Sequence, residues 1–522
     1  MRANRLSPTA RPDAPRRTIL LGTAGAILQI ARQLALLDAP QRPRLVGALL
    51  WRDADATTRG QLESTGITIL GVAHQINEFV NPDEVDCVLI SLPAAMSEAI
   101  AALRTSVRRL GVPDRFFPTI EDQLAGVGPR SQFEIDVADL IGRAPRPIDE
   151  RAVAEVITGN TVLITGAGGS IGSELARRCA AFDPAELVLM ERSENALFEI
   201  DRQIARLAPH LRRRALLHDV TDAPRTLALC REIRPQVIFH SAAHKHVPMM
   251  QDHPVEAIRN NFFGTVSIAD AAAASGCERF VMISTDKAVN PTSTMGMTKR
   301  LAELYVQHMN QQSASLFRMV RFGNVLASSG SVLPTWAEQI RQGGPVTVTH
   351  PDMERYFMTI PEAASLVIQA AALEDRKGGE VLLLDMGEPI RILDLAKRFI
   401  EAHGLEARVQ EDGIIREAAS GRSSGQISIV FTGIRPGEKL FEELACDGES
   451  MLPTTHPGIH IWTMTPPRAE QVREMVASLQ RCCEQGDGPG AERLIRSLVP
   501  ELNEPTVNIE PRLVRRPESL VA

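Results

Sequence analysis

The chain has 522 residues, which is too long for one ordinary domain and suggests two to four. Hydrophobic residues make up 44% and charged residues 23%, which is the balance of a soluble globular protein. The net charge of −7 argues against a nucleic-acid or anionic-membrane partner, because both require a positive surface.

The cysteines and the N-terminal residues indicate the compartment. Seven cysteines are scattered along the chain without a CxxC pair, which is typical of a reducing environment. The apolar residues 18–37 follow two arginines, so an export signal is the alternative, but polar residues interrupt the stretch and no clean cleavage site follows. No uninterrupted run of about 18 apolar residues occurs, so we expect a cytoplasmic protein without a membrane span.

The first part of the chain predicts a small α/β domain. Residues 1–16 are rich in proline and arginine and predict a disordered tail. In residues 17–125, short apolar runs alternate with amphipathic stretches, which predicts a Rossmann-like domain with a parallel sheet. Its first turn has Gly22 but lacks the two further glycines of a dinucleotide fingerprint. We therefore favour a nucleotide-type fold that binds no nucleotide.

The rest of the chain predicts a second, larger α/β domain. We expect residues 126–159 to form a connector that ends in a helix, and residues 160–470 again alternate strands with helices. Near residue 470 the strand pattern stops, and residues 471–522 predict short helices and a loose tail. The expected fold class is α/β, with two doubly wound, Rossmann-like parallel-sheet domains and a smaller C-terminal part on the second.

A glycine loop opens the second domain. The apolar strand at residues 161–165 runs into the frame Gly166-x-x-Gly169-x-x-Gly172, and a helix follows. Glycines let the backbone turn tightly and approach a pyrophosphate, whose charge then lies at the helix N-terminus. The fingerprint alone is weak, but its strand and helix are both present. We expect the cofactor to contact Gly166, Gly168, Gly169, Ser170, Ile171 and Gly172.

An acidic residue after the next strand favours NAD as the cofactor. Glu191 lies about 20 residues after the last glycine, where it would accept hydrogen bonds from the adenosine ribose and repel a 2′-phosphate. Arg192 follows directly and keeps NADP open as the less favoured alternative. We expect Asp219 and Val220 to meet the adenine, with a helix cap as the other explanation for Asp219.

Three histidines lie in residues 240–246, in the turn after a predicted strand. They raise the question of a metal, but no acidic residue completes a ligand set there and Lys245 would repel a cation, so we expect no metal. The small residues Ala242 and Ala243 are expected beneath the nicotinamide. Lys245 is expected beside the cofactor ribose or a substrate phosphate.

The strand at residues 279–284 leads into the charged stretch Thr285–Lys287. Open α/β sheets bind ligands at the carboxyl edge, so we expect Asp286 and Lys287 in an active site rather than as a solvated ion pair. Downstream, Met295 and Lys299 share one helical face. Dehydrogenases of the short-chain type normally carry Tyr-x-x-x-Lys there, but neither of the two tyrosines in this chain has a lysine four residues later.

Several motifs together resemble one family. They are Thr165-Gly-Ala-Gly-Gly-Ser-Ile-Gly-Ser-Glu-Leu175, His244-Lys-His-Val-Pro248, Ser284-Thr-Asp-Lys-Ala-Val-Asn-Pro291, Met295-Gly-Met-Thr-Lys299, Arg321-Phe-Gly-Asn-Val325 and Arg435-Pro-Gly-Glu-Lys439. The chain resembles the CapD-like polysaccharide-biosynthesis proteins, which are UDP-N-acetylglucosamine 4,6-dehydratases of the extended short-chain dehydrogenase type. The resemblance covers residues 17 to about 500. Long-form members likewise have methionine where tyrosine is usual, and they typically begin with membrane helices, which we do not expect here.

The resemblance implies a reaction and a role for each residue. A 4,6-dehydratase moves hydride from sugar C4 to NAD, removes the C5 proton, eliminates the C6 hydroxyl as water and returns the hydride to C6. By similarity, Lys287 would be the base at C5, Asp286 the acid at C6, and Thr285 would hydrogen-bond O4. Lys299 would hold the cofactor ribose. Met295 cannot take a proton, so the group that deprotonates O4 stays open.

The resemblance also implies that the smaller C-terminal part binds a UDP-sugar. The expected contacts are Lys245, Asn324, Ser331, Arg355, Arg435 and Glu438. For Arg355 an exposed surface arginine is the other explanation. A nucleotide-sugar 4-epimerase or dehydrogenase is the alternative enzyme, and a non-catalytic NAD-binding scaffold is the alternative class. We expect a homo-oligomer, either a dimer or a larger assembly.

Overall fold

The computed structural model describes residues 17–35, 43–82, 84–93, 96–110, 112–117, 119, 140–143, 146–373, 378–403, 405–410, 426–444, 451–463 and 465–502. The chain divides into two compact units, residues 1–134 and residues 135–522. The predicted tail at residues 1–16, the end of the predicted C-terminal part at residues 503–522, and residues 126–139 of the predicted connector lie outside the described residues.

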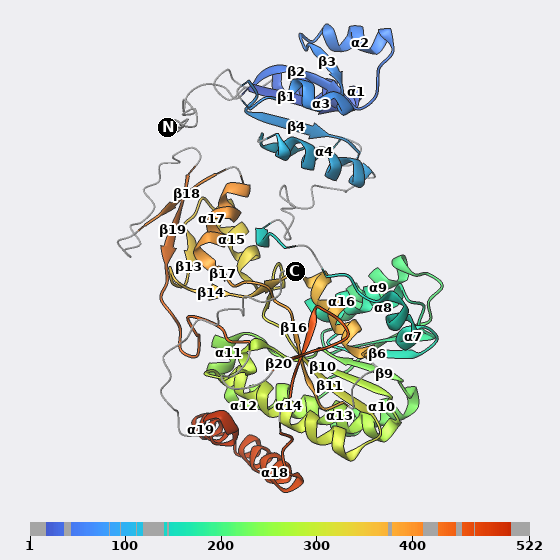
Figure 1. Ribbon diagram of the computed structural model, residues 1–522, viewed down its shortest axis with the longest axis vertical. Helices are drawn as coiled ribbons and strands as arrows, with labels where there is room; N and C mark the ends of the chain where they lie inside the picture. Colours follow the sequence, from blue (N-terminus) through green and yellow to red (C-terminus); the bar gives the residue numbers. More distant parts are fainter. Residues whose placement is uncertain are drawn as a thin grey trace, which may run out of the picture. The chain divides into compact units, whose positions relative to one another are not determined.

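The N-terminal unit contains a five-stranded parallel sheet with helices on both faces (Figure 1). In spatial order the strands are β3 (Ile69–Val72), β2 (Arg44–Leu50), β1 (Arg17–Gly22), β4 (Cys87–Ser91) and β5 (Asp114–Phe116). The helices are α1 (Ala24–Ala35), α2 (Ala56–Glu63), α3 (Ile76–Phe79) and α4 (Ser97–Arg109). Successive strand residues point to opposite faces, so Leu20 packs with residues of α1 and α2, whereas Ile19 and Leu21 pack with residues of α3 and α4.

The second unit is built on a nine-stranded sheet. In spatial order the strands are β8 (Arg213–Leu217), β7 (Glu186–Glu191), β6 (Thr161–Thr165), β9 (Val237–His240), β10 (Arg279–Ile283), β11 (Leu316–Arg321), β16 (Val381–Leu384), β21 (Ile459–Trp462) and β20 (Met451–Pro453). The first seven strands are parallel, and β21 and β20 are antiparallel to their neighbours. The strand order reverses between β6 and β9, and open sheets of this kind bind ligands at such a switch point.

Helices cover both faces of this sheet (Figure 1). The core on one face includes residues of α7 (Glu150–Ile157), α8 (Ser170–Ala180), α9 (Glu194–Leu207) and α16 (Ile360–Ala371). The core on the other face includes residues of α10 (Ala223–Ile233), α13 (Gly264–Ser275), α14 (Thr294–Gln312), α18 (Ala469–Gln485) and α19 (Gly488–Leu498). Neighbouring residues of β6 again point to opposite faces: Ile164 packs in the core that includes α8 and α16, and Leu163 packs in the core that includes α13 and α14.

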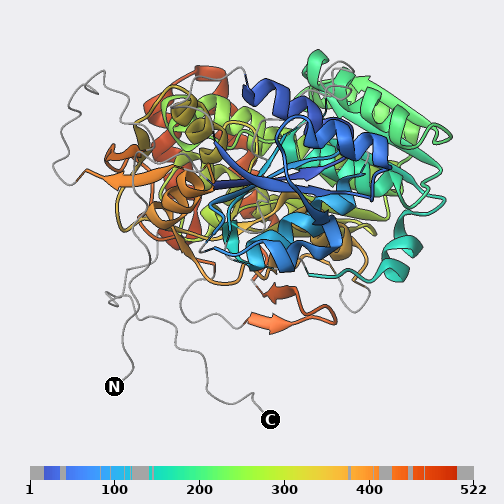
Figure 2. The ribbon, with the colours of Figure 1, turned by 90° about the horizontal axis from the view of Figure 1, so that it is seen from above.

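A smaller lobe of the second unit lies to one side of the sheet (Figures 1 and 2). It contains a three-stranded parallel sheet of β13 (Val346–Val348), β19 (Gln426–Phe431) and β18 (Glu406–Val409). Helices α15 (Val332–Arg341) and α17 (Ile392–Ala402) cover it, and Trp336 and Phe399 pack together in its core. Two short strand pairs complete the lobe, namely β12 (Asn324–Val325) with β15 (Phe357–Met358) and β14 (Glu354–Arg355) with β17 (Ile390–Arg391).

The predicted fold class is confirmed, because both large sheets are doubly wound and dominated by parallel strands. Helix α7, predicted at the end of the connector, packs against α16, and α18 and α19 pack against α14. In the described part of the chain, no helix is both long enough and apolar enough to cross a bilayer.

Candidate functional site

The glycine loop joins β6 to α8 and has no room for side chains. A Cβ on Gly172 would lie 2.1 Å from the carbonyl oxygen of Gly166, and one on Gly168 would lie 2.5 Å from the Cβ of Ala196. Gly166 has a φ of +63°, and a Cβ there would lie 2.7 Å from the amide nitrogen of Ala242. The loop backbone therefore stays bare in front of α8, as a bound pyrophosphate would require.

The remaining predicted residues of the loop form the start of α8. Gly169 is the N-cap, and no side chain caps the helix. Ser170 begins the helix, and its Oγ accepts a hydrogen bond from the amide of Ser329 (3.1 Å). Ile171 is half-buried against the core. The first turn of α8 thus keeps free backbone N–H groups beside the glycines.

Glu191 ends β7 and contacts the glycine loop. Its carboxylate accepts hydrogen bonds from the backbone N–H groups of Gly168 (3.1 Å), Arg192 (3.0 Å) and Ser193 (3.1 Å). The guanidinium of Arg192 donates to Asn260 (3.2 Å) and to a ring nitrogen of His244. Glu191 is therefore an acidic group fixed beside the loop.

A pocket of about 440 Å³ lies at this end of the sheet, lined by Arg192, Ser193, Leu217, His218 and Asp219. Asp219 lies 3.8 Å from the guanidinium of Arg192 and accepts hydrogen bonds from Thr221 within its own loop, so it does not cap a helix. Val220 is buried in the core next to it. The position beside Glu191 is the one where nucleotide folds place adenine.

His240 is a neutral core residue. Its Nδ1 lies 2.7 Å from Oγ1 of Thr165 and its Nε2 3.0 Å from Oγ1 of Thr265. Burial, together with the charge of Lys299, lowers the pKa of His240 to about 3. Within the described ranges, no group of three or more His, Cys, Asp or Glu side chains is arranged to hold a metal ion.

Asn261, which the sequence analysis did not single out, fixes the turn that carries Ala242, Ala243 and Lys245. It is fully buried on the π-helix η4 (Ile258–Phe263). Its Oδ1 accepts from the amide of His244 (2.7 Å), and its Nδ2 donates to the carbonyl of the same residue (3.0 Å). The signal for this residue is an asparagine directly before the apolar pair Phe262-Phe263, because a buried amide needs a hydrogen-bond partner.

Lys245 links this turn to the loop that follows β12. Its Nζ donates to Oγ of Ser328 (3.2 Å) and to the carbonyl of Ser329 (2.7 Å). Ser331 ends the loop as the N-cap of α15, and its buried Oγ has no hydrogen-bond partner. The loop thus brings a lysine, a spare hydroxyl and a helix N-terminus to the same edge of the sheet, a combination suited to phosphate.

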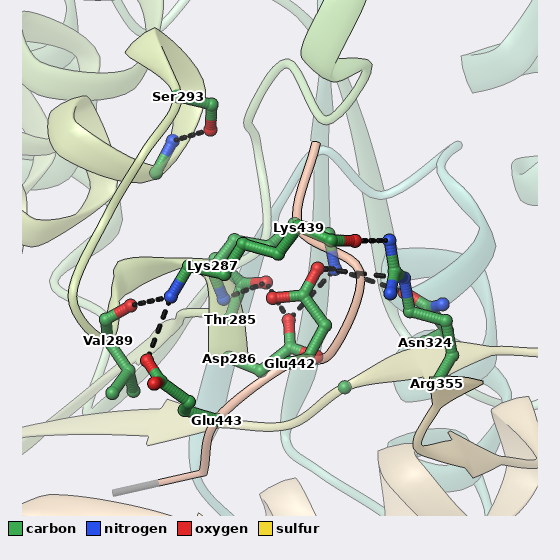
Figure 3. A network of polar contacts seen from close by, with 12 residues as sticks. Thr285, Asp286, Lys287, Val289, Ser293, Asn324, Arg355, Lys439, Glu442 and Glu443 are labelled. Atoms are coloured by element: carbon green, nitrogen blue, oxygen red, sulfur yellow. Dashed lines mark hydrogen bonds and ion pairs between the residues drawn. The ribbon is translucent and has the colours of Figure 1, made fainter. Parts of the chain in front are cut away.

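The buried Asp286 and the partly buried Lys287 form an ion pair just beyond β10 (Figure 3). Nζ of Lys287 lies 3.0 Å from Oδ1 of Asp286 and 3.1 Å from Oδ1 of Asn324. Thr285 also donates to Oδ1 of Asp286 (2.9 Å). The Asp286 side chain is 0% exposed, and its Oδ2 has no hydrogen-bond partner among the residues that the structure describes. The structure thus brings four of the predicted residues together and leaves one carboxylate oxygen uncommitted.

A second carboxylate, that of Glu442, joins this network (Figure 3). Its Oε1 lies 3.4 Å from Nζ of Lys287 and 3.6 Å from Nε of Arg355, and its side chain is 3% exposed. Burial alone would lower the pKa of Lys287, but the charges of Asp286 and Glu442 outweigh it and raise that pKa. Sequence spacing gave no signal for Glu442, because more than 150 residues separate it from Lys287.

Arg355 is buried, so its alternative explanation as a surface arginine is wrong. Its guanidinium donates to the backbone carbonyls of Lys439 (2.6 Å) and Leu440 (3.0 Å). Arg355 therefore holds the chain segment that precedes Glu442 rather than pointing an uncommitted donor at a ligand.

Residues 432–444, here named the cover segment, lie over the turn that follows Lys287. Nζ of Lys439 donates to the carbonyl of Val289 (3.1 Å) and pairs with Glu443 (2.9 Å), and Thr292 donates to the carbonyl of Gly437 (3.2 Å). The two predicted nucleotide contacts on this segment bond to each other. Glu438 accepts from the amide of Arg435 (3.2 Å), and the Arg435 side chain is exposed.

Lys299 is buried on α14 and makes no hydrogen bond to any residue that the structure describes. Burial lowers its pKa to about 8, against the opposing charge of Glu303. One turn earlier, Met295 packs into a small apolar cluster with Val247, Met250 and Ala257. Lys299 is thus an unpaired buried ammonium, whereas Met295 is an apolar packing residue.

Glu303 and Arg321 form a fully buried ion pair between α14 and β11. Two hydrogen bonds join them (2.7 and 2.5 Å), Ser284 adds a third to the carboxylate (2.6 Å), and Arg321 stacks on Trp462 at 4.1 Å. The arginine of the Arg321–Asn324 motif is therefore committed to holding α14 in place.

Strand order and glycine loop together define a doubly wound Rossmann fold. Residues 162–464 match the family described as Polysaccharide biosynthesis protein, and the chain belongs to this family.

Individual relatives and one solved structure agree with this assignment. The chain is 40% identical over 450 residues to the probable polysaccharide biosynthesis protein EpsC of Bacillus subtilis, covering 86% of this chain and 71% of that protein. It is 40% identical over 426 residues to the capsular polysaccharide biosynthesis protein CapD of Staphylococcus aureus, covering 81% and 67%. The solved structure of Pen from Bacillus thuringiensis is similar with a TM-score of 0.52 and 28% identity, over 62% of this chain and 98% of that one.

Proposed function

We propose that this protein is a nucleotide-sugar 4,6-dehydratase that converts UDP-N-acetylglucosamine to UDP-2-acetamido-2,6-dideoxy-4-keto-hexose for bacterial polysaccharide synthesis. The observation that carries the proposal is the ion pair of buried Asp286 and partly buried Lys287 at the carboxyl edge of the sheet that bears the glycine loop. Epimerisation or oxidation at C4 needs proton transfer at O4 alone. Dehydration also needs a base at C5 and an acid at C6, and this pair supplies both kinds of group.

NAD is the cofactor that these residues fit. A bare glycine loop, the fixed carboxylate of Glu191 and the unpaired ammonium of Lys299 would hold its pyrophosphate, adenosine ribose and nicotinamide ribose respectively. When bound, NAD accepts the hydride from C4 and returns it to C6, so the net reaction is redox-neutral. Arg192, which would favour NADP, already contacts Asn260 and Asp219, and this supports NAD.

The resting ion pair holds the proton that the reaction needs. One proton passing from Nζ of Lys287 to Oδ1 of Asp286, across 3.0 Å, leaves a neutral amine as the base for C5 and a carboxylic acid for the C6 hydroxyl. Both groups reach their working states without exchange with solvent. Thr285, which now donates to Asp286, would turn its hydroxyl towards O4.

The UDP group would lie between the loop after β12 and the cover segment. Phosphate oxygens would contact Lys245, Ser331 and Arg435, while Asn324 would contact the sugar side and Glu438 the uridine ribose. Arg355 would act through the cover segment that it holds. Lys245 and Asn324 now donate to or accept from protein groups, so we expect substrate to replace those contacts.

Incubation of the purified protein with UDP-N-acetylglucosamine tests the proposal by mass spectrometry. We expect a product that has lost one water and carries a 4-keto group, without accumulation of reduced cofactor. A product of unchanged mass would identify an epimerase, net reduction of added NAD a dehydrogenase, and no turnover a binding scaffold. Each of these three results would overturn the proposal.

A further inference from the structure

Three oxygen atoms surround Nζ of Lys287. They are Oδ1 of Asp286 at 3.0 Å, Oδ1 of Asn324 at 3.1 Å and Oε1 of Glu442 at 3.4 Å. Asp286 and Asn324 accept hydrogen bonds from this ammonium group, whereas Glu442 forms an ion pair with it. When Nζ passes its proton to Asp286, the negative charge of Glu442 remains beside the amine and opposes the loss of the ammonium charge. Formation of the base is therefore favoured when the Glu442 carboxylate is withdrawn.

Glu442 is the contact that can be withdrawn. Asp286 is the neighbour of Lys287 in the chain, and Asn324 is fixed in the β12–β15 strand pair. Glu442 makes the longest of the three contacts and belongs to the cover segment, which also carries Arg435 and Glu438. Its second oxygen, Oε2, is buried and has no hydrogen-bond partner in the described part of the chain, so no described group holds the carboxylate on that side.

The charges around the amine balance only when Glu442 is present. Asp286 and Glu442 carry one negative charge each, and Lys287 and Arg355 one positive charge each. Withdrawal of the Glu442 carboxylate leaves an excess positive charge in a buried site, which disfavours the ammonium form of Lys287. A movement of the cover segment that carries Glu442 away would thus favour the neutral amine form of Lys287.

We propose that Glu442 is a positioning residue that couples occupation of the nucleotide site to the acid–base pair: with the site empty it holds Lys287 as an ammonium, and binding of the UDP group to the cover segment withdraws it and frees the amine for C5. This inference rests on the proposed function for its last step only. The coupling of a UDP-binding segment to Lys287 can be measured whether or not the sugar is dehydrated.

The test is the pH dependence of Lys287 labelling by an amine-reactive reagent, followed by peptide mass spectrometry with and without UDP. The reagent reacts with the neutral amine, so the midpoint of the curve reports the pKa of Lys287. We expect UDP to move the midpoint to lower pH in the wild-type protein. In Glu442→Gln the midpoint without UDP should already be lower by about one pH unit, and UDP should move it little further.

Two further variants distinguish coupling from a general structural effect. Glu442→Asp keeps the charge and should retain the response to UDP. Glu443→Gln makes the same chemical change one position away, on a half-exposed carboxylate that pairs with Lys439 and not with Lys287, and should leave the midpoint without UDP unchanged. Equal midpoints in wild type and Glu442→Gln, or an equal UDP response in both, would overturn the inference. If these shifts occur but UDP-N-acetylglucosamine yields no 4-keto product, the proposed function fails and the coupling stands.

Discussion

At the position where related dehydrogenases carry a tyrosine, this chain has Met295, and neither of its two tyrosines takes over. Tyr305 lies on the same helix, but its hydroxyl donates to Asp270 (2.6 Å), and burial raises its pKa. Tyr356 is half-buried, and burial together with nearby carboxylates raises its pKa as well. Neither phenol has a neighbouring carboxylate that is proposed to take up its proton in the active site, whereas Lys287 pairs directly with Asp286. The proposal therefore assigns the proton transfers to Asp286 and Lys287.

Replacement of Lys287 by alanine should abolish dehydration while NAD stays bound. The amine is proposed to act at C5 and lies apart from the glycine loop, so we expect the rate of 4-keto product formation to fall at least about a hundredfold. Product formation and the cofactor content of the purified protein are the two measurements. Lys397→Ala, on α17 of the smaller lobe, is the control. Normal turnover by Lys287→Ala would show that another group is the C5 base.

Lys299 should destabilise the NAD-free protein at neutral pH. Its pKa in the folded chain is about 8, below the ordinary value of 10.5, so the folded state gives up a proton that the unfolded state keeps. Below pH 8 this difference costs about 3 kcal/mol of folding free energy, and the cost fades as the pH rises from 8 to 10.5.

Lys299→Met should therefore raise the unfolding midpoint of the NAD-free protein at pH 7, and the gain should shrink at pH 10. The same variant should bind NAD more weakly. Denaturant unfolding at the two pH values measures the effect. An equal gain in stability at both pH values, or a loss of stability at pH 7, would show that burial of the Lys299 ammonium does not destabilise the folded protein.

The residues proposed to react could be singled out from the sequence, whereas their contacts with distant residues could not. Thr285, Asp286 and Lys287 are adjacent and follow an apolar strand, so pattern alone placed them at the sheet edge. Glu442 contacts Lys287, which is distant from it in the sequence. Asn261 holds the backbone of His244 by two hydrogen bonds. Only the folded chain brings such groups within hydrogen-bonding distance.

At the scale of elements, the strand–loop–helix unit β6–α8 depends on close backbone packing. A Cβ at Gly172 would lie 2.1 Å from a carbonyl oxygen, so Gly172→Ala must push the loop away from α8. We expect a loss of about 1–3 kcal/mol in stability and a marked loss of NAD binding. Gly25→Ala, in the corresponding turn of the N-terminal unit, is the matched control because an added Cβ there meets nothing within 4 Å.

Calorimetric titration of NAD into both glycine variants gives the result. Wild-type affinity in Gly172→Ala would mean that the loop does not hold the cofactor. A loss of NAD binding in Gly25→Ala would instead assign the cofactor to the N-terminal unit.

The long strands were predictable because a parallel sheet that is covered on both faces requires apolar residues on both faces. Strands β6 and β10 are accordingly nearly continuous apolar runs. The pairs β12–β15 and β14–β17 are only two residues long and carry no such pattern. They form because the neighbouring elements of the smaller lobe place them together.

At the scale of the whole molecule, the two units have separate cores. The hydrophobic clusters of the second unit use residues from Leu140 onwards, and those of the N-terminal unit end at Val112 or before, apart from partly buried Phe116 and Phe117. The sequence pattern indicated two α/β regions because the alternation of strands and helices restarts after residue 160. The packing of α7, α18 and α19 in the second unit depends on tertiary contacts, which the periodicity of the sequence does not predict.

A chain of residues 135–522 should fold and form the 4-keto product by itself. It contains the glycine loop, the acid–base pair and the cover segment, together with the cores that position them. A single cooperative unfolding transition and product formation at a rate within about threefold of the whole chain are the expected results. A fragment that folds but is inactive would assign an essential catalytic contribution to the N-terminal unit.

The most direct test of the acid–base pair is the reaction of the whole protein with UDP-N-acetylglucosamine in deuterium oxide, with the product examined by NMR. We predict one deuterium at C5, because the C5 proton is removed and replaced from groups that exchange with solvent. We predict none at C6, because the hydride that NAD returns to C6 comes from C4 and does not exchange with solvent. Lys287→Ala should show no incorporation. A dehydrated product that keeps its original hydrogen at C5, or full incorporation in Lys287→Ala, would contradict the assignment of proton transfer to Asp286 and Lys287.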